Sequence, residues 1–265
     1  MKAAEIVRGD GPVVVAVPHA APWLPEEVAA RLNETGRALA DADWRVDRLY
    51  EGLLAGATLV RATFHRYLID ANRDPSGASL YPGRNTTGLV PLTDFDGRPI
   101  WREPPTQAEV ATRRDRFHAP YHAALAAEVA RAKARWGVAV LYDAHSIRSR
   151  IPFLFEGTLP DFNIGDAEGR ACAPVVVAAL REVCEAAEGF ATVTNGRFKG
   201  GWTTRAYGRP AEGVHAVQME LAQSSYLEAE APPWAFSEAK AARLRPTLAE
   251  CLARLDRLAR SGALA

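Results

Sequence analysis

The sequence lacks the cysteine patterns and the long apolar runs by which many protein classes are recognised. Its 265 residues include three cysteines. Cys172, Cys184 and Cys251 are widely spaced, form no CxxC pair and cannot all pair within one chain, so we expect buried or half-buried free thiols. The N-terminus has no long apolar stretch, and no window approaches the roughly 20 apolar residues that span a bilayer, which predicts a cytoplasmic protein.

The sequence also lacks an excess of charge of either sign. Lysine and arginine total 32, as do aspartate and glutamate, so the formal net charge is zero. No global field attracts the protein to nucleic acid or to a membrane, and we expect it to bind neither. The apolar fraction of 48% can fill the core of one α/β domain, which we expect to span residues 1–265.

The chain contains an alternation of apolar, strand-like runs with helical patterns. Short runs rich in valine at 12–17 and 138–142 are typical of strands buried on both faces. Further strands are predicted at 58–63, 66–69, 191–194 and 214–219, and helices at 26–40, 106–135, 171–187 and 237–260, with Pro120 expected to break or kink the second helix. This alternation favours a mixed, mostly parallel sheet covered by helices. The segment 74–105 is too long for a simple connection, so we expect a functional lid or binding loop, with disorder as the alternative.

Polar residues follow three of the predicted strands, at His19, His145 and Glu220. In sheets of this kind, ligands bind beyond the carboxyl ends of the strands. Two histidines in equivalent positions suit a catalytic zinc ion, which takes about three histidine or carboxylate ligands and leaves one position open. Asp43 is the first candidate for the third ligand and Asp47 the second, while capping or solvent-facing roles are the alternative for these aspartates.

The other four histidines are expected to be structural. His118 and His122 stand four residues apart on a predicted helix, a spacing that can bind a metal ion. They lack the glutamate of an HExxH motif, however, and Pro120 lies between them. The remaining two, His65 and His215, belong to no recognisable metal-binding pattern.

Several residues suit acid-base chemistry or the binding of an anion. Glu220 follows an apolar strand directly, so desolvation would raise its pKa toward that of a general base, with a helix cap as the alternative role. Asn72 and Arg73 offer a planar guanidinium beside an amide, which suits a carboxylate, although an ion-pair centre with the neighbouring aspartates is also open. Further donors stand at Arg84, Thr87, Arg148 and Arg205. Together these residues predict a small anionic substrate.

Six segments, taken in order along nearly the whole chain, resemble the N-formylglutamate amidohydrolases. They are VPHA at 17–20, DADW at 41–44, IDANRDP at 69–75, YDAHSIRS at 142–149, NGRFKGG at 195–201 and HAVQMELAQ at 215–223. Each segment alone would be weak, and the ordered set is specific. The resemblance implies a three-layer α/β/α sandwich with a mixed central sheet, similar to the zinc carboxypeptidases and aspartoacylases.

The resemblance also implies roles for individual residues. His19 and His145 would be zinc ligands, Glu220 the general base, and Asn72 with Arg73 the group that holds a substrate carboxylate. The carboxypeptidase pattern HxxE would place a carboxylate at Pro22, which cannot ligate. The third ligand must therefore come from elsewhere, and Asp43 remains the first candidate.

The implied reaction is the zinc-dependent hydrolysis of N-formyl-L-glutamate to formate and L-glutamate in histidine degradation. One zinc or other divalent ion per chain is expected, with Arg148 or Arg205 facing the oxyanion and with Arg84 and Thr87 at the substrate. Hydrolysis of another N-acyl amino acid and a catalytically silent carboxylate-binding protein are the alternatives. A serine nucleophile at Ser146 is disfavoured because its segment is no G-x-S-x-G elbow.

Overall fold

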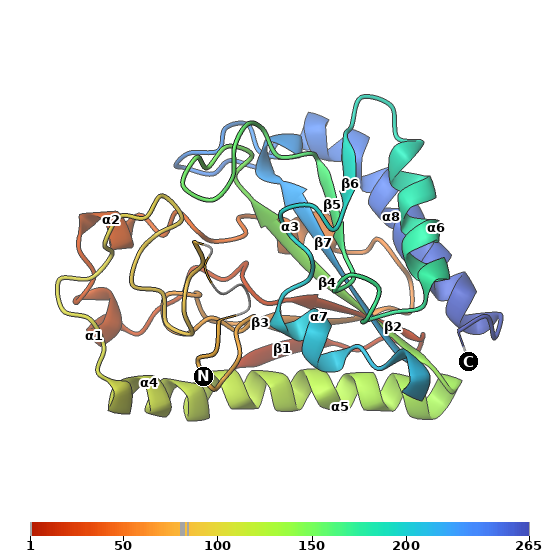
Figure 1. The fold of residues 1–265 in the computed structure, drawn as a ribbon, viewed down its shortest axis with the longest axis horizontal. Helices are drawn as coiled ribbons and strands as arrows, with labels where there is room; N and C mark the ends of the chain where they lie inside the picture. The colour runs from red at the N-terminus through yellow and green to blue at the C-terminus, as the bar shows by residue number, and fades with distance from the viewer. Residues whose placement is uncertain (1, 80–82, 84, 265) are drawn as a thin grey trace.

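A mixed sheet of seven strands organises the part of the chain that the computed structural model describes, residues 2–79, 83 and 85–264 (Figure 1). In chain order the strands are β1 (Ala4–Val7), β2 (Val13–Val17), β3 (Thr58–Ala62), β4 (Ala139–Ile147), β5 (Phe162–Gly165), β6 (Thr192–Thr194) and β7 (Val214–Ala222). Their spatial order is β1-β3-β2-β4-β7-β5-β6. The central strands β3, β2, β4 and β7 are parallel, whereas β1 is antiparallel to β3 and β5 is antiparallel to β7.

Helices lie on both faces of this sheet. They are α1 (Glu26–Ala29), α2 (Glu34–Arg37), α3 (Val46–Tyr50), α4 (Gln107–Arg113), α5 (Ala119–Trp136), α6 (Pro174–Glu185), α7 (Trp202–Tyr207) and α8 (Glu238–Arg260), with a π-helical turn at Arg114–His118 and 3-10 turns at Pro210–Glu212 and Gln223–Ser225. Figure 1 shows α5 along one side of the sheet, and α6 beside α8 on the other. Within the described residues, no helix combines the length and the apolar content that crossing a membrane requires.

Strand β2 shows why the sheet needs a helical layer on each face. All five of its residues are buried. Val13, Val15 and Val17 belong to the core that includes α6 and α8, whereas Val14 and Ala16 belong to the core that includes α5. Because successive side chains of a strand point to opposite faces, both faces of the sheet are covered. The predicted three-layer α/β arrangement with a mixed sheet is thereby confirmed.

The C-terminal helix supplies much of one apolar layer. Leu244, Leu248, Leu252 and Leu255 of α8 recur every three or four residues and are almost fully buried. Full burial of a leucine side chain stabilises a fold by roughly 1.5–3 kcal/mol. The three cysteines are buried free thiols, as predicted.

Two predicted elements are wrong. The segment 66–69 is a buried turn and no strand, because the Leu68 amide donates to the His65 carbonyl oxygen at 2.9 Å. Apolar composition does not distinguish a buried turn from a short strand. The predicted helix 26–40 is divided into α1 and α2, since the Asn33 side chain accepts a hydrogen bond from the Gly36 amide and caps a new helix there.

Pro120 does not end the long helical stretch, which continues from α4 through the π-helical turn into α5. The regular α-helical pattern is disrupted only locally, in the π-helical turn directly before this proline. The predicted strands 138–142 and 214–219 both continue further, through the polar residues that were expected to follow them. The strands β1 and β5 and the short helices α3 and α7 were not predicted, since each has only four to six residues and little periodicity.

Candidate active site

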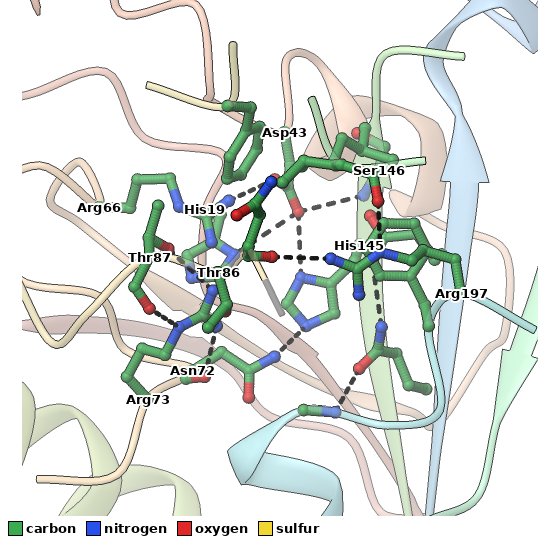
Figure 2. A pocket seen from close by; sticks show the side chains of 18 residues that line it. His19, Asp43, Arg66, Asn72, Arg73, Thr86, Thr87, His145, Ser146 and Arg197 are labelled. Carbon is green, nitrogen blue, oxygen red and sulfur yellow. Dashed lines mark hydrogen bonds and ion pairs between the residues drawn. The ribbon is translucent and has the colours of Figure 1, made fainter. Parts of the chain in front are cut away.

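The candidate active site is a pocket at the carboxyl ends of the central parallel strands (Figure 2). Strand β2 ends at Val17, and His19 follows two residues later. Strands β4 and β7 pair in register, so that His145 lies opposite Glu220. Side chains at the same register of neighbouring strands project to the same face. The sheet itself therefore brings His145 and Glu220 together, and both line the pocket with His19.

His19, Asp43 and His145 form a buried cluster in which one ligand atom of each lies within 4.8 Å of the others. The Asp43 Oδ2 atom lies 3.1 Å from His145 Nδ1 and 3.8 Å from His19 Nδ1. Within the described residues, His19 Nδ1 is buried without a hydrogen-bond partner. A buried ring nitrogen in that state is costly. Two imidazoles and a carboxylate that converge in this way fit a divalent cation.

Further carboxylates contact the far side of both rings. His19 Nε2 lies 2.8 Å from Asp70 Oδ1, and His145 Nε2 lies 3.1 Å from Asp143 Oδ1. Metal-ligating histidines usually donate their other N–H to a carboxylate, which fixes the ring and its tautomer. The His19–Asp70 hydrogen bond suits this role, and Asp143 lies within ion-pair distance of the His145 ring. Arg66 in turn holds Asp70, with its Nη2 atom 2.7 Å from Asp70 Oδ2.

The charges of this cluster are strongly coupled. Burial opposes the charged form of Asp43, yet the neighbouring rings of His145 and His19 lower its pKa. Burial likewise opposes ionisation of Asp70, but Arg66, Arg73 and His19 hold its pKa well below the usual range. For His145, burial favours the neutral ring, whereas Asp143 and Asp43 raise its pKa well above the usual value. The pocket floor is thus built to hold positive charge at the ring nitrogens.

The structure separates the two candidates for the third ligand. Asp43 belongs to the cluster, and its amide donates to the His19 carbonyl oxygen at 3.0 Å. The side chain of Asp47 is 35% exposed, and its carboxylate lies 3.5 Å from Arg61 Nη1. The nearby Asp41 is buried but accepts hydrogen bonds from the Tyr67 hydroxyl and the Phe95 amide. Asp43 is therefore the carboxylate that the fold places beside both histidines.

Glu220 is a buried carboxyl group beside the cluster. Its Oε2 atom accepts a hydrogen bond from Gln218 Nε2 at 3.0 Å, and Gln218 Oε1 accepts one from the Gly201 amide at 2.7 Å. Burial raises the pKa of Glu220 to about 8, with Asp43 reinforcing the shift and His145 opposing it. A carboxyl group whose pKa is near neutral can both accept and return a proton.

Asn72 and Arg73 line the pocket next to the cluster. The Asn72 side chain accepts from the Thr203 amide at 2.8 Å, and its Nδ2 atom lies 3.0 Å from His145 Nε2. Arg73 donates through Nε to the Thr87 carbonyl oxygen and through Nη2 to Thr87 Oγ1, both at 2.9 Å. Asn72, Arg73 and Thr87 therefore meet at one wall.

Two predicted residues, Arg148 and Arg205, are not brought to this wall. Arg148 Nη2 lies 3.1 Å from Asp96 Oδ2, and Arg205 donates to the Gly200 carbonyl oxygen at 3.0 Å. Neither is among the described residues that line the pocket. Arg84 lies outside the described residues.

Two other arginines, Arg66 and Arg197, line the pocket and were given no role from the sequence. Arg66 was hidden in the supposed strand 66–69. Arg197 belongs to the motif at 195–201, and the presence of an arginine in that motif was the signal that could have identified it as a site residue.

The protein thus has an α/β fold with a candidate metal centre at one end of its sheet. This centre consists of two histidines and one carboxylate, all buried. The family model described as N-formylglutamate amidohydrolase matches residues 11–227. The chain belongs to this family.

Two curated relatives share much of the sequence. The chain is 49% identical to the N-formylglutamate deformylase of Pseudomonas aeruginosa over 230 residues, which cover 85% of both chains. It is 44% identical to the N-formylglutamate deformylase of Pseudomonas putida over 234 residues, or 87% of both chains.

Solved structures share the fold. The N-formylglutamate amidohydrolase of Ralstonia eutropha is 28% identical, with a TM-score of 0.82 that covers 99% of this chain and 100% of that one. A gene product of Agrobacterium tumefaciens is 20% identical, with a TM-score of 0.73 over 97% of this chain and 96% of that one, and it supports the fold alone.

Proposed function

We propose that this protein is a cytoplasmic, single-domain enzyme that hydrolyses N-formyl-L-glutamate to formate and L-glutamate in histidine degradation. The family membership and the names of the relatives support the substrate. The observation that supports the chemistry is that His19 Nδ1 is buried without a hydrogen-bond partner among the described residues, while both it and His145 Nδ1 lie close to Asp43 Oδ2.

We assign one zinc ion, or another divalent ion, to His19, Asp43 and His145. Two imidazoles and one carboxylate form a ligand set that catalytic zinc sites use. A zinc ion bound there would polarise the formyl carbonyl group and lower the pKa of a water molecule. Asp70 and Asp143 would hold the two rings in the required orientation.

Glu220 is the proposed general base and then the general acid. It takes a proton from the attacking water as the oxygen bonds to the formyl carbon. It returns this proton to the amide nitrogen as the C–N bond breaks, so that formate and the free amino group of glutamate are released. Gln218 donates to the Glu220 carboxylate and fixes its position.

The remaining polar groups orient the substrate. Asn72 and Arg73 hold its α-carboxylate, since Asn72 contacts His145 directly and the α-carboxylate lies close to the scissile bond. Arg66 lines the pocket, and its Nη1 atom lies 3.7 Å from Asp43 Oδ1. We therefore propose that Arg66, in place of Arg148 and Arg205, stabilises the developing oxyanion. Thr87 holds the Arg73 guanidinium in place.

The test combines elemental analysis of the purified protein with assays of N-formylglutamate and a panel of other N-acyl amino acids. We expect about one zinc-like ion per chain and formate release from N-formylglutamate. Faster turnover of a larger acyl group would instead assign the enzyme to another N-acyl amino acid. Binding of a carboxylate ligand without a metal ion and without turnover of any substrate would indicate a silent binding protein.

A further inference from the structure

Two arginines face the pocket from opposite sides in the view of Figure 2, Arg73 and Arg197. Arg73 extends from the segment after the buried turn at 66–69, and Arg197 from the connection between β6 and α7. They are therefore far apart in the sequence and meet only in the folded protein. The proposed substrate carries two carboxylates, and only the α-carboxylate has so far been given a partner.

One short segment holds both guanidinium groups. Arg73 donates to the carbonyl oxygen and the Oγ1 atom of Thr87, and Arg197 Nη2 donates to the Asn85 carbonyl oxygen at 2.9 Å. Arg197 Nε also donates to the Leu154 carbonyl oxygen at 2.9 Å. These hydrogen bonds fix the positions of both guanidinium groups at the pocket, where Arg73 also lies 3.8 Å from Asp70 Oδ2.

The spacing of these anchors suits a short dicarboxylate. Asn85 and Thr87 are two residues apart, a span of about 7 Å at most for an extended chain. In glutamate the two carboxylate carbons are separated by four C–C bonds of about 1.5 Å each, which span up to about 5 Å. Leu154 and Phe198 also line the pocket and offer apolar surface to the intervening methylene groups.

We propose that Arg197 binds the side-chain carboxylate of the substrate and so makes the pocket selective for acyl derivatives of acidic amino acids. This inference rests on the proposed function. Arg73 lies beside Asn72, which contacts His145, and so takes the carboxylate nearer the scissile bond. Arg197 then takes the distal one, as a specificity-determining residue that acts on binding more than on the chemical step.

The experiment compares N-formyl-L-glutamate with N-formyl-L-glutamine, which differs only by a neutral amide at the distal position. Arg197→Gln should lower kcat/KM for N-formylglutamate by roughly 10- to 100-fold, mainly through KM, because a charge-assisted hydrogen bond is lost. The value for N-formylglutamine should change less than about threefold, by the same reasoning. Arg197→Lys, which keeps the charge, should fall between the wild type and Arg197→Gln for N-formylglutamate.

Arg150→Gln is the matched control, because Arg150 is an exposed arginine that donates to Thr158 Oγ1 and is not among the described residues lining the pocket. It should change neither substrate. An equal loss for both substrates in Arg197→Gln, or no loss for either, would overturn the assignment. Melting temperatures of all variants show whether a loss reflects unfolding.

Failure of the proposed function gives a different result. If the wild type releases no formate from N-formylglutamate, calorimetric titration with L-glutamate and L-glutamine still tests Arg197. A preference of the wild type for glutamate that disappears in Arg197→Gln supports the inference, and an unchanged preference overturns it.

Discussion

The described part of the chain contains two pairs of neighbouring buried histidines whose surroundings differ in kind. The ring centroids are 5.0 Å apart for His19 and His145 and 4.5 Å apart for His118 and His122. The first pair faces three carboxylates. In the second pair, His118 Nε2 donates to the Arg73 carbonyl oxygen at 3.0 Å and His122 Nε2 to that of Ala71 at 2.7 Å. Closeness of two imidazoles is thus common to both pairs, and the carboxylates distinguish them.

The electrostatic consequence is opposite for the two pairs. Burial lowers the pKa of His122 to about 3, with His118 adding to the shift, and burial also lowers the pKa of His118. For His145 the carboxylates overcome burial and raise the pKa. The second pair is therefore neutral at physiological pH and suited to hold main-chain carbonyls. The first pair is suited to positive charge.

The two pairs are connected through Asn72. His118 and His122 hold the carbonyl groups of the residues on either side of it, while its side chain contacts His145. A structural histidine pair thereby positions a residue of the candidate active site. Trp202 packs against both rings, with centroids 5.4 Å from His118 and 4.6 Å from His122.

The largest effect is expected from substitutions in the first histidine pair, which should remove the metal ion. His19→Ala or His145→Ala should reduce metal content from about one ion per chain to a small fraction, since each removes a ligand of a three-ligand site. His122→Ala should keep the metal ion. Elemental analysis of the three variants decides the matter, and full occupancy in all of them would refute the ligand assignment. Asp43→Ala against Asp47→Ala is the matched test of the carboxylate, and only the former should weaken metal retention.

The next effect concerns the chemical step beside the first pair. Glu220→Gln nearly preserves shape but cannot accept a proton, so kcat should fall by about 10² to 10⁴. This corresponds to roughly 3 to 5 kcal/mol of barrier. Metal content and melting temperature, measured in parallel with formate release, should stay close to those of the wild type. Near-normal turnover in the folded, metal-loaded variant would rule out Glu220 as the base.

A smaller effect is expected at Arg73, whose carbonyl oxygen the second pair holds and which we propose binds the substrate carboxylate. Arg73→Lys keeps the charge but loses the planar fork that matches a carboxylate. We expect kcat/KM for N-formylglutamate to fall by about tenfold, the loss of one hydrogen bond to a charged group. Steady-state kinetics of the folded variant measures this, and unchanged values would remove Arg73 from the site.

The last prediction concerns the contrast in charge between the two pairs. The folded-state pKa of His122, about 3, lies below the unfolded value of about 6.5. The unfolded state therefore binds an extra proton between these values, and stability is lost as pH falls from about 6.5 toward 3. A His122→Gln variant, which keeps a donor but does not titrate, should remove about 1.4 kcal/mol per pH unit from this slope. Urea unfolding at several pH values in that window gives the slope, and identical slopes would contradict a neutral His122.

Several features could be predicted from the sequence because they depend on local pattern. The β-branched runs of β2 and β4 and the leucine spacing of α8 reveal buried strands and an amphipathic helix. His19 and His145 stood out because each is attached to such a run. The ordered motifs pointed to the family, which the comparisons confirm.

Other features were decided only by the tertiary structure. The choice of Asp43 over Asp47 depends on which carboxylate the fold carries to His19 and His145, and two aspartates four residues apart look alike in a sequence. The presence of Arg66 and Arg197 in the pocket depends on a buried turn and on a loop that faces the pocket. Hydrophobic periodicity is a local property of the chain, whereas a site built from distant segments is set by long-range packing and by charges that become strong only when buried together.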